Sequence, residues 1–132
     1  MMSVLCRYCV GAFVAMIAGN ALAQDVPSGQ PVSLYEVLID NVNNESWLRF
    51  RFIAPRIARA GGDITYGDAA LDMEHLCASF VLPYLSEYDL NSDMIVISLA
   101  DQKTEFGDTN PDATQFFDAF RVKNKACIWE AF

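Results

Sequence analysis

The N-terminal segment constrains this chain most, because it decides which cysteines remain available to stabilise the fold. One cation, Arg7, precedes an apolar run of ten residues (CVGAFVAMIA), and a small-x-small pattern that ends at Ala23 follows the run. This order of features is typical of a secretory signal peptide, and the run is shorter than the roughly 20 residues that span a bilayer. We therefore predict a signal peptide over residues 1–23, cleaved after Ala23, and a mature protein in an oxidising compartment.

Two cysteines, Cys77 and Cys127, remain after that cleavage. In a small exported domain, two cysteines most simply form one disulfide bond. Closing a loop of this length stabilises a fold by roughly 4 kcal/mol in the chain-entropy model. A reactive thiol pair favours a CxxC spacing or a cationic neighbourhood, whereas Glu74 and His75 are near Cys77. We predict a structural disulfide.

The chain is acidic, with 17 acidic residues, 9 basic residues and a formal net charge of -8. Nucleic acids bind proteins through Lys and Arg, and anionic membranes attract basic segments, so we expect neither partner. The sequence after residue 23 contains no second long apolar run, no glycine-rich phosphate motif and no CxxC pair. We therefore expect a soluble product without a cofactor and without membrane association after signal cleavage.

The segment after the signal peptide predicts a leader and then a hairpin. Residues 24–32 lack a periodic pattern, and we predict a flexible leader there. Two alternating segments, Ser33–Asp40 and Trp47–Ile53, flank a turn-rich connection, and this pattern is typical of a β-hairpin. One register satisfies both strands. It pairs Tyr35 with Phe52, Val37 with Phe50, Ile39 with Leu48, and Glu36 with Arg51 on the other face.

One main helix is predicted from Asp68 to about Leu82, with Asp68 as its N-cap and Pro83 forcing an end or a kink. When the helix is projected at about 100° per residue, most of its surface is apolar. We therefore expect a largely buried helix with Cys77 pointing inward. The polar residues share one narrow stripe that we expect to face solvent: Asp68, Asp72, His75 and Ser79.

The C-terminal half of the chain predicts three more strands. The continuous apolar run Met94–Leu99 indicates a strand buried on both faces. A helical turn is expected over Asp112–Gln115. A second hairpin follows over Phe116–Val122 and Ala126–Phe132, although FFDAF in its first half is equally compatible with a helix. The turn at Asn124-Lys125 pairs Val122 with Cys127 and Phe120 with Trp129.

These elements predict a single α+β domain over residues 33–132. One main helix packs on an antiparallel sheet of about five strands. The inward-pointing Cys77 of the helix and Cys127 of the second hairpin then connect the two layers through the disulfide.

Three helix residues superficially suggest a catalytic triad, because Asp72, His75 and Ser79 lie at helical spacing. A triad also needs an oxyanion hole and a nucleophile presented into a cleft. A solvent-facing stripe provides neither, so we predict no catalytic residues. A small hydrolase or metal-assisted enzyme centred on His75 and Asp72 stays the alternative function.

Two loops, residues 89–93 and 108–112, match the D-x-N-x-D opening of a calcium loop. The complete loop needs Gly at its sixth position and Glu at its twelfth, and neither loop has them. Asp and Asn also satisfy backbone amides in ordinary turns. We interpret both segments as turns and predict no metal site.

Four of the few basic residues fall close together: Arg49, Arg51, Arg56 and Arg59. Trp47 shares a strand face with the first two. Trp47, Arg49 and Arg51 are therefore a candidate docking patch for an acidic protein or a carboxylate ligand, through bidentate pairing and cation–π contacts. The competing interpretation is internal charge balancing with acids such as Glu36 and Asp40, which contributes little per exposed pair.

Three segments carry a resemblance to a known family: AALDMEHLC (Ala69–Cys77), MIVISLAD (Met94–Asp101) and PDATQFFDAFRVKNKACIWEAF (Pro111–Phe132). They resemble a family of small exported proteobacterial proteins known as a domain of unknown function. The resemblance implies the periplasm as the destination, and it brings no activity, cofactor or catalytic residue. Together with the residue patterns, it favours a non-catalytic binding or accessory protein.

Overall fold

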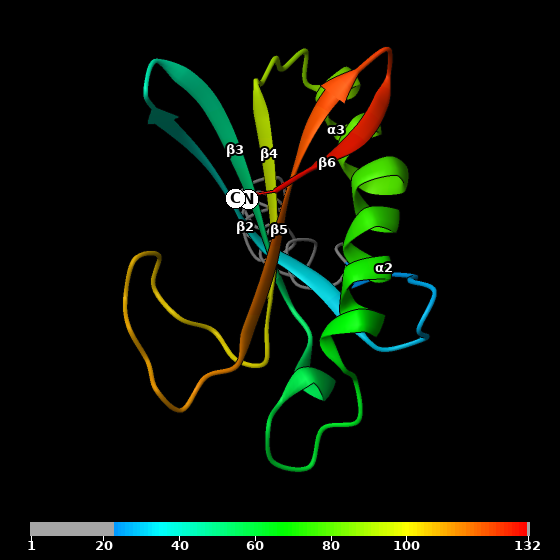
Figure 1. Ribbon diagram of the computed structural model, residues 1–132, viewed down its shortest axis with the longest axis vertical. Helices are drawn as coiled ribbons and strands as arrows, with labels where there is room; N and C mark the ends of the chain where they lie inside the picture. Colours follow the sequence, from blue (N-terminus) through cyan, green and yellow to red (C-terminus); the bar gives the residue numbers. More distant parts are fainter. Residues whose placement is uncertain (1–22, 132) are drawn as a thin grey trace, which may run out of the picture.

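The computed structural model describes residues 23–131, so the predicted signal peptide lies outside the described residues except for Ala23. Six strands form one sheet in the order β1-β2-β3-β4-β5-β6, and the helices lie against one face of it (Figure 1). We call this the inner face, and the opposite one the outer face. The strands are β1 (Ala23–Gln24), β2 (Val32–Val42), β3 (Glu45–Ile53), β4 (Met94–Ala100), β5 (Gln115–Lys123) and β6 (Ala126–Glu130).

The predicted register of the first hairpin is confirmed over most of its length. Val37 lies opposite Phe50, Ile39 opposite Leu48, and Glu36 opposite Arg51. The pairing of Tyr35 with Phe52 is wrong, because the register shifts between Leu34 and Glu36 and Leu34 takes that place. A β-bulge of this kind adds one unpaired residue and reverses the face of the side chains beyond it. The extra residue is Tyr35, whose hydroxyl donates to the Thr104 carbonyl oxygen at 2.6 Å.

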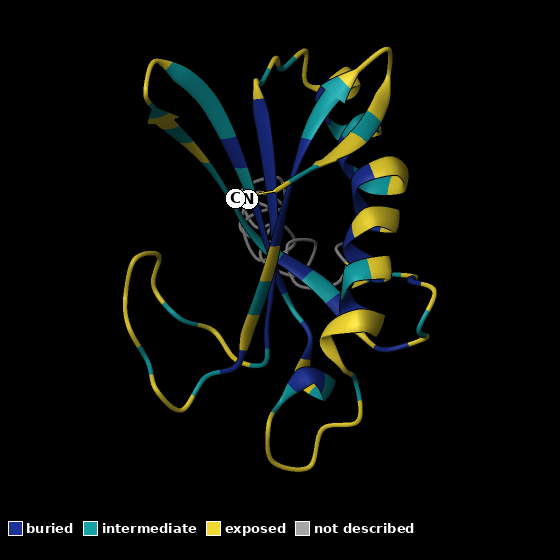
Figure 2. Cartoon of the chain, viewed as in Figure 1, coloured by how far each residue is buried: buried dark blue, intermediate teal, exposed yellow. Residues whose placement is uncertain are grey.

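The sheet is mixed, and not antiparallel throughout as predicted. β3 and β4 pair in parallel, with Phe50 opposite Ile97. A parallel pair needs a long crossover connection, and here the helical segment between the two strands supplies it. The six strands exceed the expected five because the two-residue β1 adds to the edge of β2. The buried strand predicted over Met94–Leu99 is confirmed, since every residue of β4 is buried (Figure 2).

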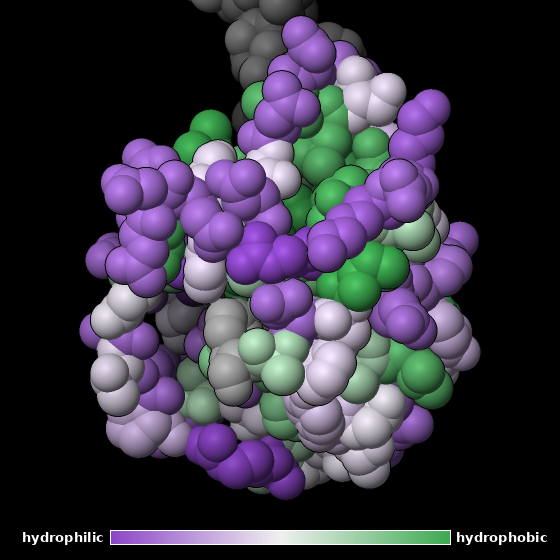
Figure 3. All heavy atoms as spheres, turned by 45° about the horizontal axis from the view of Figure 1, so that its top comes forward, coloured by the Kyte–Doolittle hydropathy of each residue, from purple (hydrophilic) through white to green (hydrophobic). Residues whose placement is uncertain are grey.

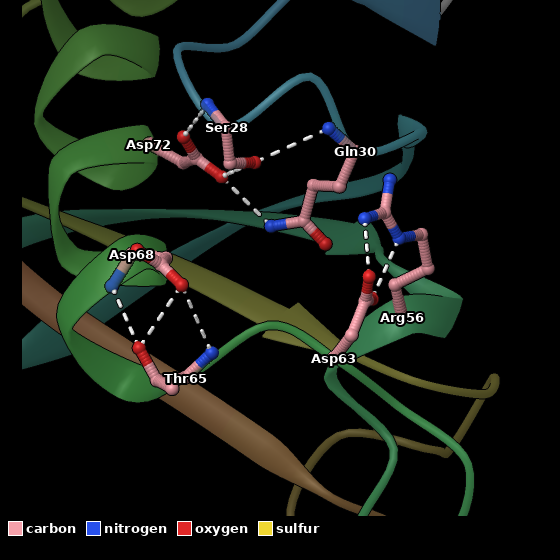
Figure 4. Close-up of polar contacts among 7 residues, drawn as sticks. All are labelled: Ser28, Gln30, Arg56, Asp63, Thr65, Asp68 and Asp72. Carbon is pink, nitrogen blue, oxygen red and sulfur yellow. Dashed lines mark hydrogen bonds and ion pairs between the residues drawn. The ribbon is translucent and has the colours of Figure 1, made fainter.

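The main helix begins earlier than predicted and has a different cap. α2 spans Tyr66–Leu76, and its N-cap is Thr65 instead of Asp68. The Thr65 side chain accepts the Asp68 backbone N–H, and the Asp68 carboxylate accepts the Thr65 backbone N–H at 3.3 Å (Figure 4). This is a reciprocal capping box. The carboxylate of Asp68 therefore closes the first turn from inside the helix.

Pro83 distorts the helical segment without ending it. A wide π-helical turn, η2 (Cys77–Val81), separates α2 from α3 (Leu82–Glu87). The Leu82 N–H donates to the Cys77 carbonyl, five residues before it. Because proline lacks an N–H and its ring crowds the carbonyl four residues earlier, we attribute this wider turn to Pro83. The sequence left open whether Pro83 ends or kinks the helix, and the structure shows that it distorts the helix.

The second hairpin is confirmed as two strands, with Val122 opposite Cys127 and Phe120 opposite Trp129. Its turn residues Asn124 and Lys125 have φ values of 53° and 62°, the left-handed pair that a two-residue hairpin turn requires. The helical turn expected over Asp112–Gln115 is wrong, since β5 already begins at Gln115. There the Asp112 N–H donates to the Asn110 side chain at 3.0 Å, a local turn bond that replaces a helical one.

The Cys77–Cys127 disulfide is present, as predicted, with its Cα atoms 6.2 Å apart. It joins η2 to β6 across the inner face. Around it, fully buried Phe50 and Phe52 of β3 both contact Phe80 edge to face, at centroid distances of 6.2 and 6.0 Å. Such ring pairs add to the energy of area burial. The inner face is therefore a packed apolar layer with a covalent link through it.

α2 is buried on one side only, so the expectation of a largely buried helix is wrong. Met73, Leu76 and Cys77 are fully buried, whereas Leu71 is 60% exposed. The helices pack on one face of the sheet and no described element lies over their other side, which is exposed in Figure 2. Among the described residues, no helix is long and apolar enough to cross a membrane. Hydrophilic side chains cover much of the end of the molecule that is turned forward in Figure 3, with hydrophobic patches between them.

The segment predicted as a flexible leader has defined contacts with the helix. Asp72 is fully buried, and its carboxylate accepts hydrogen bonds from the Ser28 N–H at 2.9 Å, the Ser28 hydroxyl at 2.6 Å and the Gln30 side-chain amide at 2.7 Å (Figure 4). Val26 and Gln30 are buried as well. A buried carboxylate requires such donors. The structure thus differs from the sequence expectation both for this segment and for Asp72 as a solvent-facing residue.

Candidate functional site

Alternation along β3 gives the sheet two different faces. Leu48, Phe50 and Phe52 belong to the inner core, and successive strand residues point to opposite sides. The predicted patch residues Trp47, Arg49 and Arg51 therefore lie on the outer face. The loop of residues 101–114 extends over this side of the sheet, opposite the helices (Figure 1). The three residues thus share one face of the sheet with a loop that the sequence did not assign to them.

Arg51 is almost completely buried, with 4% of its surface exposed. Its guanidinium donates to Glu36 at 2.9 Å, to the Thr104 carbonyl oxygen at 2.9 Å and to the Thr104 hydroxyl at 3.1 Å. The rings of Tyr35 and Phe106 lie 5.2 and 5.7 Å from its central carbon. These contacts hold the loop against the sheet. Arg51 is therefore a positioning residue, as the charge-balancing interpretation requires.

Arg49 is less enclosed and has a different set of partners. Its Nε and Nη2 donate to Asp40 at 3.3 and 3.2 Å. Its guanidinium carbon lies 5.4 Å from the Trp47 ring centre and 5.0 Å from that of Phe106. Within the described part of the chain, Arg49 Nη1 has no hydrogen-bond partner. Arg49 is thus held by aromatic faces while keeping one donor for a ligand.

Trp47 is oriented by a second ion pair on the same face. Its indole Nε1 donates to Glu45 at 3.2 Å, and Arg121 of β5 donates to the other oxygen of Glu45 at 3.1 Å. The hydrogen bond from Arg121 is the main cause that lowers the pKa of the Glu45 carboxyl below its ordinary value, with that from Trp47 next. Glu45 therefore stays ionised at neutral pH and fixes the indole beside Arg49.

A cleft of about 290 Å³ lies between the loop and the outer face, and Arg49 and Arg51 line it. Phe106 of the loop and Phe117 of β5 are each 51% exposed and form part of its wall. The remaining lining residues are Val96, Ser98, Thr104, Glu105, Gly107, Asp108 and Gln115. The cleft thus combines two arginines, two aromatic rings and two carboxylates.

The four clustered arginines separate in the structure. Arg56 pairs with Asp63 at 2.6 Å inside the connector that precedes α2 (Figure 4). The guanidinium of Arg59 donates to the carbonyl oxygens of Pro111 and Ala113. Neither belongs to the cleft. Sequence reasoning missed Phe106, and its one available signal was an aromatic residue inside an otherwise polar connector.

The residues of the suggested triad do not come together. The Asp72 carboxylate faces Ser28 and Gln30, His75 is exposed, and the Ser79 hydroxyl donates to the His75 backbone carbonyl at 2.8 Å. Ser79 therefore makes a local helix contact instead of a contact with the imidazole. The arrangement gives the alternative hydrolase no assembled nucleophile and base.

In each calcium-like segment, one side chain accepts a backbone N–H. Asp93 accepts the Ser46 N–H at 2.8 Å and so joins its loop to the start of β3, and Asn110 accepts the Asp112 N–H at 3.0 Å. In residues 23–131, no group of three or more His, Cys, Asp or Glu side chains is arranged to hold a metal ion. The outer-face cleft is therefore the candidate functional site.

The chain belongs to DUF6497, a family of unknown function, whose family model matches residues 9–132. No curated protein and no solved structure matches this chain. The resemblance seen in the sequence is thus confirmed as far as membership of a family of unknown function. The exported and proteobacterial aspects of that resemblance stay predictions.

Proposed function

We propose that this protein is an exported, non-catalytic binding module, and that its outer-face cleft binds a small carboxylate with an apolar body. The observation that carries the proposal is Arg49, which lines the cleft between two aromatic rings and keeps Nη1 as a donor. A guanidinium on aromatic faces is pre-oriented and less strongly hydrated than an ammonium group. It therefore loses little freedom when it binds a carboxylate.

The existing partner of Arg49 does not prevent such binding. The Arg49 and Asp40 side chains are 20% and 37% exposed, and ion pairs with this much solvent contact contribute little to stability. A ligand carboxylate can accept from Nη1 while Asp40 keeps Nε and Nη2. Charge-assisted hydrogen bonds of this kind are about twice as strong as neutral ones.

The other charges of the cleft restrict the ligand further. Glu105 and Asp108 also line it, so a polyanion or a strongly acidic protein surface meets repulsion there. A ligand with one carboxylate for Arg49 and one amino group for these acids matches both ends. The cleft volume of about 290 Å³ is at the low end for ligand sites. An amino acid or dipeptide with an apolar side chain fits this description.

Calorimetric titration with three probes tests the proposal: L-phenylalanine, 3-phenylpropionate and phenethylamine. We expect Arg49→Gln to weaken binding of the two carboxylates about tenfold or more, since a hydrogen bond to a charged group contributes about 1.5–3 kcal/mol. Binding of phenethylamine should not change. Arg56→Gln, which removes an arginine outside the cleft, should leave all three affinities intact.

Two outcomes contradict this function. One is the absence of binding by the wild-type protein to any of the three probes at millimolar concentration. The other is an equal effect of Arg49→Gln on the amine and on the carboxylates, because the arginine then acts on the fold of the cleft instead of on a ligand carboxylate.

The exported part of the proposal rests on the signal-peptide pattern over residues 1–23. Cleavage after Ala23 leaves Gln24, which pairs with Val32 of β2. We expect the protein in the periplasmic fraction of a Gram-negative host, with the mass of residues 24–132 and one disulfide. Recovery of the uncleaved chain from the cytoplasm contradicts this part alone.

A further inference from the structure

A second surface lies between α2 and β6, on the inner side of the sheet and away from the outer-face cleft. Three large apolar side chains meet solvent there: Tyr66 is 48% exposed, Leu71 60% and Trp129 59%. They line a groove of about 290 Å³ together with Ala70, Glu74, Asp118 and Phe120. Isolated exposed apolar residues are normal, but a contiguous group beside a groove marks an interaction surface. We refer to it as the edge groove.

The groove borders the free edge of the sheet. In the part of the chain that the structure describes, β6 pairs with β5 alone and ends the strand order. Lys123 and Ala126 form the pair that closes the hairpin turn, and such a pair exchanges both backbone hydrogen bonds. Because bonding alternates along the strand, the N–H and C=O of Trp129 point away from β5. An incoming strand can bond to both groups.

β6 lacks most of the features that protect edge strands from such pairing. Natural edges are blocked by proline, by inward-pointing charges or by bulges, whereas the sequence of β6 is ACIWE and its register with β5 is regular. The charged residue of β6 is Glu130, and its carboxylate forms an ion pair with Arg121 of β5 at 3.4 Å. As far as residues 23–131 show, the edge is therefore open to strand addition next to an apolar groove.

The charges around the groove indicate what kind of segment it takes. Its charged lining residues are Glu74 of α2 and Asp118 of β5, and the groove contains no Lys, Arg or His. Asp118 is 8% exposed and accepts the Tyr66 hydroxyl at 2.8 Å, whereas Glu74 is exposed. A basic side chain on the inner face of an added strand can thus reach Glu74, while apolar side chains contact Leu71 and Trp129.

We propose that the edge groove binds an extended segment of a basic partner protein by strand addition to β6, with apolar and basic side chains of that segment alternating over Leu71, Trp129 and Glu74. In this mode, backbone hydrogen bonds supply affinity and the groove supplies specificity. The proposal does not depend on the outer-face cleft, since no residue is shared between the two linings.

Two capped hexapeptides serve as probes, Ac-VTKTVT-NH2 and its glutamate counterpart Ac-VTETVT-NH2, which differ by one charge. We expect the lysine peptide to bind in an NMR titration of the full domain and to slow hydrogen exchange at the Trp129 amide. The double variant Leu71→Ser, Trp129→Thr should bind it about tenfold more weakly, because exposed aromatic and aliphatic anchors dominate such interfaces. Both side chains are exposed, so the fold is retained.

Ile39→Ser is the matched control, because Ile39 is 70% exposed on the first hairpin and far along the sheet from β6. It should leave the affinity unchanged. Glu74→Lys should reverse the preference in favour of the glutamate peptide. The proposal is overturned if the lysine peptide fails to bind, if both peptides bind equally, or if the double variant binds as the wild type does. Sedimentation of the wild type, but not of the double variant, as a dimer also overturns it, since the occupant is then a second copy.

Discussion

The two faces of the sheet are built from the same strands but are held by different forces. On the inner face, the rings of β3 pack under the helices, and a disulfide joins η2 to β6. On the outer face, two arginines are held between aromatic rings and carboxylates beneath one loop. Apolar burial is the main source of stability, whereas partly exposed ion pairs contribute little. The outer face can therefore be shaped for binding at small cost to the fold.

The largest difference between the faces should appear when one phenylalanine is removed from each. Phe50 is completely buried and Phe106 is 51% exposed. Phe50→Ala should lower the free energy of unfolding by about 3–5 kcal/mol, and Phe106→Ala by less than about 1 kcal/mol. Urea denaturation measures both values. Similar losses for the two variants contradict the division of roles between the faces.

The disulfide gives the next largest effect. The double variant Cys77→Ser, Cys127→Ser should lose about 2–5 kcal/mol, because the unfolded chain regains the freedom of a 50-residue loop. Reduction of the wild type with dithiothreitol should lower its melting temperature toward that of the variant. A wild type whose unfolding is insensitive to reductant shows that the link is unnecessary for the inner face.

The buried carboxylate of Asp72 tests the edge of the inner layer. Asp72→Ala leaves the donors of Ser28 and Gln30 without their acceptor, which should lower the free energy of unfolding by about 2–3 kcal/mol. Hydrogen exchange of residues 25–31 should accelerate more than that of β4. Glu74→Ala, an exposed change on the same helix, should have almost no effect. Equal effects of the two changes refute the role of Asp72.

Arg51 tests how the outer face is held together. Arg51→Met removes the donors to Glu36 and Thr104. The free energy of unfolding should fall by only about 1–2 kcal/mol, because the Glu36 carboxylate can be hydrated instead. Limited proteolysis should cut loop 101–114 faster than in the wild type. Arg49→Met, which leaves both Thr104 hydrogen bonds in place and removes only a ring contact with Phe106, should raise the cleavage rate less. Unaltered cleavage in Arg51→Met shows that other contacts position the loop.

The smallest expected effect concerns the pH dependence of the connector before α2. The hydrogen bond from Arg56 lowers the pKa of the Asp63 carboxyl below its ordinary value of 3.8. A lowered pKa in the folded state adds stability above the unfolded pKa, and this stability is lost as the pH falls through the folded pKa. Asp63→Asn should therefore melt slightly lower than wild type at pH 7, and at the same temperature at pH 2. A difference that persists at pH 2 excludes the ionised pair as its cause.

The sequence predicted those parts of the fold that depend on residues close together in the chain. Alternation and the Glu36–Arg51 pair predicted the first hairpin from Val37 onward, and the Asn124-Lys125 turn predicted the second. The bulge at Tyr35 was not visible, because the Thr104 carbonyl that accepts the Tyr35 hydroxyl is distant in sequence. The parallel pairing of β3 and β4 was missed for a related reason, since a crossover depends on how the intervening helix packs.

The candidate site was predicted in part. The alternation of β3 placed Trp47, Arg49 and Arg51 on one face, and the structure keeps them there. Sequence alone did not separate the two arginines, because their difference comes from Thr104 and Phe106 of a polar loop. Asp72 was misplaced because a helical projection cannot show that the segment around Ser28 supplies donors to it.

One measurement tests the central claim that the outer-face cleft binds a small carboxylate while the disulfide-linked inner core stabilises the fold. Amide resonances of the full domain are assigned and followed by NMR during titration with L-phenylalanine. We predict that the shifts concentrate in residues 47–51 of β3 and in loop 101–114, while those of η2 around the disulfide stay in place. Shifts centred on the helices, or none at saturating millimolar ligand, contradict the account.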